Sequence, residues 1–427
     1  MNIKQLHALF LKCKGISTDT RKVSINNMFF ALKGDHFNGN SFSKQALKEG
    51  AKYVIIDQAE YKTSDKTILV ENVLKTLQAL AQYHRTYLNI PIIAITGSNG
   101  KTTTKELIHS VLLKKYKTTA TKGNLNNHIG VPLTLLSMTN NTEIGIVEMG
   151  ANHVKEIEFL SNIAKPDYGY ITNFGKAHLE GFGGVKGVIK GKSELYEYLI
   201  KNKKYVFLNA DDPIQKNKLN TYIKKFGFSQ TDTNYFKIEC LEVNPFVSFK
   251  MEDNLFKSQL IGKYNFTNLC AACIIGKYFN VPLPKIKQAI ENYIPTNNRS
   301  QIITKGNCEI ILDAYNANPT SMKAALEHFN ELKKEHKIVF LGDMFELGDE
   351  ADQEHQDIAD LTKKLDIDSV YLIGEHFFTT KNETKKIKQY KSFKALEDDF
   401  SSINLLHASL LIKGSRGMAL ERILDLM

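Results

Sequence analysis

Short apolar runs alternate with stretches of helical periodicity along most of this 427-residue chain. The apolar runs predict buried strands at 27–32, 53–57, 92–96, 144–147, 168–172, 206–209, 309–312, 338–341, 370–373 and 409–412. The stretches between them predict helices at 42–49, 73–87, 103–114, 188–198, 320–335, 352–365, 393–400 and 418–426. Such alternation predicts mainly parallel sheets with helices on both faces. Residues 234–263 differ, because short alternating runs with turn residues predict an antiparallel edge there.

The same pattern divides the chain into three α/β units, a number that agrees with its length. We predict a small N-terminal α/β unit at 1–88 and a central P-loop unit with a mainly parallel sheet at 89–296. A C-terminal unit of the doubly wound, Rossmann-like type is predicted at 297–427. It contains no G-x-G-x-x-G segment, so the sequence does not predict a dinucleotide site there.

The composition, with 42% hydrophobic and 10% aromatic residues, is typical of a globular protein. No apolar stretch approaches the ~20 residues of a membrane span, and the N-terminal apolar run is too short for a signal peptide. We therefore expect a cytoplasmic protein without a membrane partner. Cys270 and Cys273 form C-x-x-C, but they lie in the apolar stretch 268–275, which predicts a buried helix. No second Cys or His pair accompanies them, so core residues are favoured over a zinc site.

The net charge is +10, and lysine supplies nearly all of it. There is no basic stripe with interleaved aromatic residues, so we do not expect a nucleic-acid partner. The few arginines are more informative, because a guanidinium suits bidentate contacts with anions. Arg21, Arg299 and Arg416 lie in polar motifs and are candidates for such contacts, whereas Arg85 and Arg422 are expected on helix surfaces.

The apolar run 92–96 leads into Gly97-Ser98-Asn99-Gly100-Lys101-Thr102-Thr103. A strand, a glycine turn and a helix in succession aim backbone N–H groups at a phosphate. Lys101 would add a charge for the outer phosphates, and Thr102 a hydroxyl ligand for Mg²⁺. An ordinary glycine turn is the alternative, but the Lys-Thr pair favours a nucleoside-triphosphate site.

Acidic residues also follow predicted strands. Glu148 comes directly after 144–147, where a P-loop unit holds its Mg²⁺-binding carboxylate. Asp313 comes directly after 309–312. The polar loop from Ser17 to Arg21 could be no more than a turn closed by Asx hydrogen bonds.

Taken together, these segments resemble the Mur ligases, the ATP-dependent amide-forming enzymes of peptidoglycan precursor synthesis. The phosphate loop alone is shared with folylpolyglutamate synthase. Further matching segments lie at 17–21, 123–134, 313–319, 341–344 and 413–417, so the resemblance covers nearly the whole chain. The segment from Asp313 to Pro319, with its Tyr-Asn-Ala-Asn-Pro, is the most specific of them. It is similar to the members that add D-alanyl-D-alanine to UDP-N-acetylmuramoyl-tripeptide.

The resemblance implies that ATP converts the terminal carboxylate of UDP-N-acetylmuramoyl-tripeptide into an acyl phosphate, which D-alanyl-D-alanine then attacks. It implies two Mg²⁺ ions and a catalytic set of Lys101, Glu148, His178 and Lys192, with Thr102, Glu148, His178 and Lys192 near the metals. An ammonium cannot bind Mg²⁺, so Lys192 is expected to be carbamylated by CO₂.

The resemblance also implies ligand-binding roles. ATP would contact the loop from Gly97 to Thr103, Asn265 and Asn268 near the adenine, Asp313 at the ribose and Arg299 at the γ-phosphate. The family more often has His where this chain has Tyr264. The substrate residues would be Ser17, Asp19, Arg21, Asn126, Asn127, Asn316, Lys413, Ser415 and Arg416.

Two other functions stay open at this point. A different amide ligase of the superfamily would accept a different amine, and a degenerate nucleotide-binding partner protein would have no activity. The sequence does not decide whether the third peptide residue is lysine or diaminopimelate, and a monomer is expected. Because ATP ligands lie on two units, we expect the third unit to be displaced from the phosphate loop in the free chain.

Overall fold

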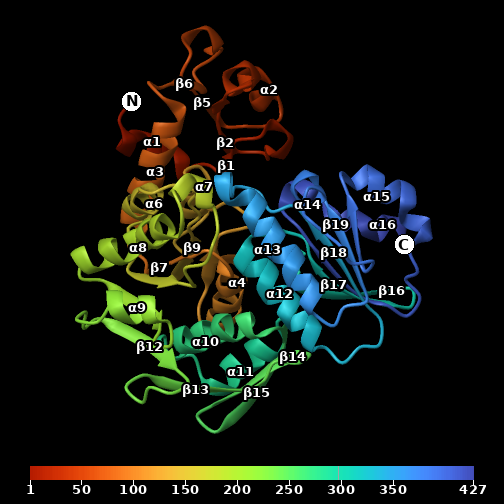
Figure 1. Ribbon diagram of the computed structural model, residues 1–427. Coiled ribbons are helices and arrows are strands. Elements are labelled where there is room, and N and C mark those ends of the chain that lie inside the picture. Colours follow the sequence, from red (N-terminus) through yellow and green to blue (C-terminus); the bar gives the residue numbers. More distant parts are fainter. Residues whose placement is uncertain (297) are drawn as a thin grey trace.

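A computed structural model describes residues 1–296 and 298–427 of the chain. Three sheets of four, nine and six strands define three α/β units, and a small two-stranded hairpin accompanies the first. The first unit lies above the central one and the third lies beside it (Figure 1). This confirms the predicted fold class. The predicted third unit begins at residue 297, which lies outside the described residues.

The first unit is built on a parallel sheet in the order β1-β2-β5-β6. Its elements are α1 (Ile3–Phe10), β1 (Gly15–Ser17), η1 (Thr20–Lys22), β2 (Asn27–Phe30), β3 (Lys33–Gly34), β4 (Phe37–Asn38), η2 (Gly39–Phe42), α2 (Ser43–Lys48), β5 (Tyr53–Ile56), η3 (Ala59–Tyr61), β6 (Thr67–Leu69) and α3 (Val73–Leu88). Helix α3 begins where the Asn72 side chain accepts the N–H of Lys75, and it ends at Asn89 in the left-handed conformation.

The central sheet has the order β15-β14-β13-β12-β11-β10-β7-β9-β8. Its elements are β7 (Ile92–Thr96), α4 (Lys101–Leu112), β8 (Thr118–Ala120), α5 (Gly130–Leu136), β9 (Ile144–Glu148), α6 (Glu156–Ala164), β10 (Tyr168–Ile171), α7 (Leu179–Phe182), α8 (Val185–Lys201), β11 (Tyr205–Asn209), α9 (Pro213–Lys218), β12 (Lys225–Ser229), β13 (Phe236–Glu242), β14 (Phe246–Met251), β15 (Asn254–Ile261), α10 (Lys263–Tyr278) and α11 (Leu283–Glu291). Strands β13 to β15 pair antiparallel, which confirms the predicted antiparallel edge. The predicted buried helix at 268–275 is the middle of α10.

The third sheet has the order β16-β17-β21-β18-β19-β20, and only the β16–β17 pair is antiparallel. Its elements are β16 (Gln301–Lys305), β17 (Cys308–Asp313), α12 (Pro319–Glu331), β18 (Lys337–Gly342), η4 (Gly348–Glu350), α13 (Ala351–Lys364), β19 (Ser369–Ile373), α14 (Glu375–Phe378), β20 (Ile387–Tyr390), α15 (Phe393–Asp399), η5 (Phe400–Ser402), β21 (Ser409–Lys413), η6 (Arg416–Met418), η7 (Leu420–Arg422) and α16 (Ile423–Leu426). The prediction of one helix at 418–426 was wrong, because Ala419 adopts a positive φ that separates two short 3₁₀ turns.

Arg85 is the second correction, because the structure buries it instead of placing it on a helix surface. Its guanidinium donates to the carbonyls of Ala164 and Lys165 and, at 2.7 Å, to the carboxylate of Asp167. Asp167 also accepts the N–H of Ile92 at the start of β7. Arg85 therefore fastens α3 to the central unit. A buried cation is stable there because its donors are satisfied.

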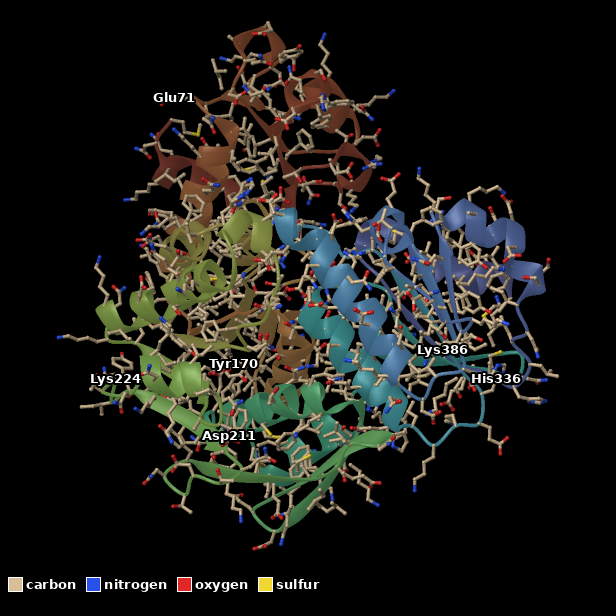
Figure 2. All side chains as sticks on the ribbon, in the orientation of Figure 1. Glu71, Tyr170, Asp211, Lys224, His336 and Lys386 are labelled. Carbon is tan, nitrogen blue, oxygen red and sulfur yellow. The ribbon has the colours of Figure 1, made fainter. Side chains whose placement is uncertain are left out.

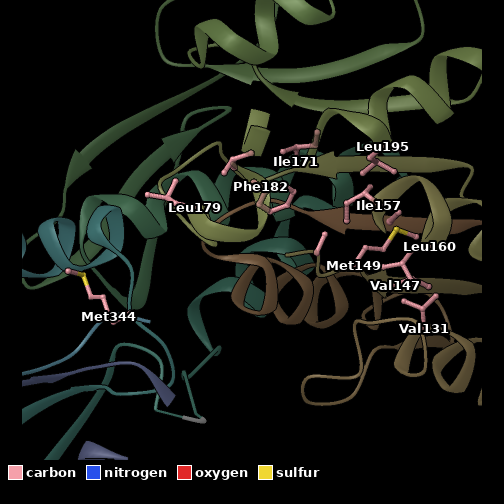
Figure 3. Close-up of a cluster of buried hydrophobic side chains, with 14 of the residues drawn as sticks. Val131, Val147, Met149, Ile157, Leu160, Ile171, Leu179, Phe182, Leu195 and Met344 are labelled. Atoms are coloured by element: carbon pink, nitrogen blue, oxygen red, sulfur yellow. The ribbon is translucent and has the colours of Figure 1, made fainter. Parts of the chain in front are cut away.

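One apolar cluster runs through the centre of the molecule. Figure 3 shows side chains from α5, β9, α6, β10, α7 and α8 meeting on one face of the central sheet. Met344 of the third unit belongs to the same cluster, so it extends across the boundary between units. In Figure 2, Tyr170 lies inside the central unit and Lys224 at its outer edge. Within the described residues, no helix is long and apolar enough to cross a bilayer.

His328 on α12 generates a prediction about stability. Its side chain is buried, neither ring nitrogen has a hydrogen-bond partner in the structure, and burial lowers its pKa from 6.5 to about 4. The unfolded chain binds the proton below pH 6.5, whereas the folded chain binds it only near 4, so stability is lost as the pH falls between these values. Replacing His328 by Leu also removes the cost of burying two unpaired polar atoms.

We expect His328→Leu to raise the free energy of unfolding by about 1 kcal/mol at pH 7 and by more at pH 5. Urea titrations of wild type and variant at both pH values measure the two increases in the free energy of unfolding. Equal gains at the two pH values, or a loss at pH 7, would contradict this prediction.

Candidate active site

Three adjacent strands of the central sheet bring their carboxyl ends together. Strand β7 lies between β9 and β10, so the loop after β7 has Glu148 on one side and Asn173 on the other. Ligands of parallel α/β sheets bind at such positions, outside the carboxyl ends of the strands. The N-cap of the third unit's α12, Asn318, contacts Asn99 in the same region.

The loop after β7 has room only for glycine at two positions. A Cβ on Gly97 would lie 2.0 Å from Oγ1 of Thr172, and one on Gly100 would lie 2.7 Å from Oδ1 of Asn268. Both glycines also have positive φ, of 138° and 77°. These contacts account for the spacing of the glycines in the sequence.

The segment after β10 holds the phosphate loop in shape. The N–H of Ser98 donates to the Asn173 carbonyl at 3.1 Å, and the N–H of Asn99 donates to Oδ1 of Asn173 at 3.0 Å. The Thr172 hydroxyl donates to the Asn99 carbonyl at 2.6 Å. The loop is therefore ordered by the protein before any ligand binds.

The start of α4 is suited to an anion. Its N-cap, Gly100, supplies no side-chain acceptor, so the first N–H groups of the helix stay available. Lys101 curls back and donates to the carbonyls of Gly97 at 2.8 Å and Ser98 at 3.1 Å. Burial lowers the pKa of Lys101 to about 8, and the charge of Arg299 acts in the same direction. A phosphate beside these groups would be stabilised by both cations.

Glu148 is the carboxylate nearest the loop, and it is buried. Its Oε1 accepts the Thr102 hydroxyl at 3.2 Å and the Asn126 amide at 2.9 Å, while its Oε2 has no hydrogen-bond partner in the structure. The ammonium of Lys105 lies 3.9 Å from this Oε2. A carboxylate oxygen that accepts no hydrogen bond and lies beside a hydroxyl fits Mg²⁺, which takes oxygen ligands and keeps several waters or phosphate oxygens. Among the described residues, no three His, Cys, Asp or Glu side chains cluster as a metal site.

Lys192 and His178 lie next to this region but differ in exposure. Lys192 is fully buried on α8, where its Nζ donates to the Ala151 carbonyl at 2.9 Å and lies 4.9 Å from the Phe182 ring. Burial lowers the pKa of Lys192 well below its usual value. His178 lines the cavity and pairs through Nδ1 with Glu346 of the third unit.

The third unit contributes a second group of cations. The Arg299 guanidinium lies 3.6 Å above the Tyr315 ring, and its buried Nε has no hydrogen-bond partner among the described residues. Asp313 accepts the Ser300 N–H at 3.0 Å and pairs with Nζ of Lys413 at 2.5 Å. Stacking on Tyr315 orients Arg299 while leaving donors for an anion.

The two units meet directly at the phosphate loop. The Asn318 amide donates to Oδ1 of Asn99 at 2.7 Å, and the N–H of Lys176 donates to the Thr320 hydroxyl at 2.9 Å. The Lys176 ammonium pairs with Glu354 on α13. The expectation of a displaced third unit was therefore wrong for this structure. These contacts bring Arg299 and the phosphate loop into one cavity.

That cavity has a volume of about 610 Å³ and is lined by both units. The predicted residues that line it are Ser98, Asn99, Gly100, Lys101, Thr102, Thr103, Asn126, Asn127, Glu148, His178, Asn265, Asn268, Arg299, Asp313, Asn316 and Lys413. Asn268 is held between the Thr104 hydroxyl and Asn265, which places this pair of asparagines directly behind Gly100.

The other predicted residues lie outside the lining. Ser17, Asp19 and Arg21 bond to one another, and Asp19 caps the short turn η1 with Arg21 largely exposed. This is the Asx-type turn that the sequence left open. Ser415 is buried and accepts the Phe345 N–H, while Arg416 is exposed and pairs with Glu421. The predicted substrate roles of these residues stay predictions.

Several lining residues were not predicted as site residues, namely Asn173, Tyr264, Tyr315, Asn318 and Thr320. The position of Asn318 could have been predicted, because Asn-Pro at 318–319 is typical of a helix N-cap. The structure shows the capping box there. Its amide reaches Asn99 from that cap. Tyr315 had no signal beyond its motif, since stacking under Arg299 depends on the loop conformation.

Three family models match the chain in succession. They are described as Mur ligase family, catalytic domain at residues 12–87, Mur ligase middle domain at 95–276, and Mur ligase, glutamate ligase domain at 298–416. The UDP-N-acetylmuramoyl-tripeptide–D-alanyl-D-alanine ligase of Bacillus subtilis is 35% identical over 96% of this chain and 92% of its own length. The ligase of the same name from Escherichia coli is 28% identical over 98% and 94%.

Solved structures resemble the whole chain as well. MurF from Acinetobacter baumannii superposes with a TM-score of 0.87 at 28% identity, covering 100% of this chain and 98% of that one. MurF from Thermotoga maritima in complex with ADP gives a TM-score of 0.83 at 26% identity, covering 98% and 97%.

The glycine geometry gives the second prediction. Gly100→Ala places a methyl group against the Asn268 side chain at a positive φ, so the phosphate loop must shift. We expect nucleotide affinity, measured by calorimetry, to fall at least about tenfold, since ~1–2 kcal/mol of strain falls on the loop itself.

Gly306→Ala is the matched control, because Gly306 also has a positive φ but nothing lies within 4 Å of its Cβ position. It should cost a similar backbone strain without changing nucleotide affinity. Unchanged affinity in Gly100→Ala would contradict the proposed role of this loop.

Proposed function

The chain belongs to the Mur ligase family, and we infer that it is the ATP-dependent ligase that joins D-alanyl-D-alanine to UDP-N-acetylmuramoyl-tripeptide in peptidoglycan precursor synthesis. One observation carries the inference beyond the family. The segment from Asp313 to Pro319 faces the phosphate loop across a single cavity, joined to it by Asn318 and Asn99. An amide ligase needs its nucleotide and its amine on such facing surfaces.

Binding of ATP would use the phosphate loop and the third unit together. The uncapped N-terminus of α4 and Lys101 would hold the β- and γ-phosphates, and Arg299 would approach the γ-phosphate from the opposite wall. Asn265 and Asn268 are assigned to the adenine side and Asp313 to the ribose. A substrate carboxylate must approach an already anionic phosphate, so this concentration of cations is what the first step requires.

Mg²⁺ would be held by Glu148 and the Thr102 hydroxyl, whose geometry fits an oxygen-ligated ion. When bound, it would neutralise charge on the phosphate oxygens. A second Mg²⁺ near His178 and Lys192 is part of the proposal. Glu148 itself is kept in place by Asn126 and Thr102, so its Oε2 has a defined position.

We propose that Lys192 is carbamylated. Its burial favours the neutral amine, which can attack the carbon of CO₂ and then release a proton to give an N-carboxylate. That group would supply oxygen ligands where the unmodified lysine offers only an ammonium.

The proposed reaction has two steps, whose reactants the two facing walls of the cavity would hold. The tripeptide carboxylate attacks the γ-phosphorus and ADP leaves. The amine of D-alanyl-D-alanine then attacks the acyl carbon, and inorganic phosphate leaves. Lys413 and Asn316 on the third unit, with Ser415 and Arg416 behind them, are proposed to hold the dipeptide. Asn126 and Asn127 would contact the sugar and peptide, and Ser17, Asp19 and Arg21 the uridine diphosphate.

We further propose that the protein works as a monomer in the cytoplasm. Described residues of a single chain supply both walls of the cavity, so the proposed reaction needs no second copy, and nucleotide-sugar and ATP are both cytoplasmic substrates.

Amine-dependent phosphate release tests the function. With ATP, Mg²⁺ and UDP-N-acetylmuramoyl-tripeptide, we expect release to depend on D-alanyl-D-alanine and not on L-alanine, D-glutamate or single diamino acids. Lys101→Met should lower kcat by about 10²–10³-fold, because a charge aimed at the transferring phosphoryl group is lost. Release that depends on another amine would replace this function by another ligase activity, and no release with any amine would favour a non-enzyme.

The modification of Lys192 has a separate test. Enzyme prepared free of CO₂ should lose activity and regain it with bicarbonate, and ¹³C-bicarbonate should give one slowly exchanging carbamate signal in the wild type that Lys192→Arg lacks. An activity indifferent to CO₂, together with no carbamate signal, would rule the modification out.

A further inference from the structure

The loop from Asp343 to Leu347, between β18 and η4, projects from the third unit and is held by hydrogen bonds. Asp343 accepts the N–H groups of His376 and Phe377, the N–H of Met344 donates to His355 at 2.9 Å, and the N–H of Phe345 donates to Ser415 at 3.0 Å. With three successive residues tied down, the next residue, Glu346, has a defined position.

Glu346 reaches across to the central unit. Its carboxylate pairs with Nδ1 of His178 and accepts the Asn152 amide at 3.4 Å, and its carbonyl accepts the N–H of Glu180 at 3.3 Å. Glu346 has a positive φ of 61°, a conformation that L-residues adopt at a cost. Gly348 is also at positive φ, and a Cβ there would lie 3.2 Å from the Glu180 side chain. The loop is thus shaped to dock here.

The contact with Glu346 determines which ring nitrogen of His178 donates a hydrogen bond. An ionised carboxylate only accepts hydrogen bonds, so Nδ1 of His178 donates in this contact, and in the neutral ring the lone pair then lies on Nε2. No hydrogen bond of Nε2 occurs within the described part of the chain, and the residue lines the cavity. Histidines that act through one nitrogen are oriented in this way by a carboxylate on the other.

His178 also starts the one-turn helix α7, and Phe182 ends it. The Phe182 ring covers Nζ of Lys192 at 4.9 Å and lies so close to Gly191 that an added Cβ there would be 2.4 Å away. Holding His178 and Glu180 in place therefore also holds the cover of Lys192.

We propose that Glu346 is a positioning residue for the reaction. It acts from the third unit on His178 and α7 of the central unit, so that docking of the third unit sets the imidazole tautomer and closes Phe182 over Lys192. The proposal rests on the proposed function for its kinetic consequence, but its structural consequence can be measured on the free protein.

Glu346→Ala is the main variant, with Glu346→Gln as the conservative one. Glu354→Gln is the matched control, because it removes a different ion pair between the same two units, that of Lys176, without touching His178. Long-range ¹H–¹⁵N spectra of protein labelled at histidine, with His178→Gln to assign the signal, report the tautomer. Steady-state kinetics report kcat and the KM for UDP-N-acetylmuramoyl-tripeptide.

We expect wild-type and Glu354→Gln protein to show the Nδ1–H tautomer of His178, and Glu346→Ala to shift toward Nε2–H. Glu346→Ala should lower kcat about 10–100-fold with KM changed less than about twofold. Glu346→Gln keeps an acceptor oxygen, so it should recover part of the Nδ1–H tautomer and part of the lost kcat.

Either of two results would overturn the proposal. One is an unchanged His178 tautomer in Glu346→Ala. The other is a loss of kcat no larger than that of Glu354→Gln, which would make Glu346 an ordinary interface contact. If wild-type protein releases no phosphate with D-alanyl-D-alanine, the proposed function fails, while the tautomer measurement still decides whether Glu346 positions His178.

Discussion

The hydrogen bond between Asn318 and Asn99 joins two sheets that have no strand in common, and the active site exists only where they meet. Asn99 belongs to the phosphate loop of the central sheet, and Asn318 is the N-cap of α12 in the third unit. Each partner is oriented by its own unit: Asn99 by Thr172 and Asn173, and Asn318 by its capping box. The contact is therefore made between two ordered surfaces, which lowers the entropy lost on docking.

Around this junction the cavity brings together charges of both signs. Lys101, Arg299 and Lys413 line it together with Glu148, Glu156 and Asp313. The charge of Arg299 acts on Lys101, and Asp313 is engaged by Lys413. Lys101 and Arg299 therefore face an entering anion from the two units, which suits a reaction between a carboxylate and a triphosphate.

Features set by local chemistry could be predicted from the sequence. The apolar residues of β7, the glycines after them and Glu148 at the end of β9 each depend on neighbours in sequence, and the structure places them as expected. The burial of Arg85 could not be predicted, because the groups that accept its hydrogen bonds lie about 80 residues away in the sequence. The pairing of His178 with Glu346, 168 residues apart, is of the same kind. The turn at Ala419 breaks a helical pattern through a single positive φ, which no periodicity reveals.

The burial of Arg85 has a consequence for how the molecule selects a substrate. Helix α3, about 24 Å long, is fastened along the central unit, so the loop with Asp19 and Arg21 stands at one constant distance from Glu148. If that loop binds the nucleotide end of the substrate as proposed, the peptide must span the distance from Arg21 to the phosphate loop before its carboxylate can react. The first two units would then select a substrate by the length of its peptide, independently of the third unit.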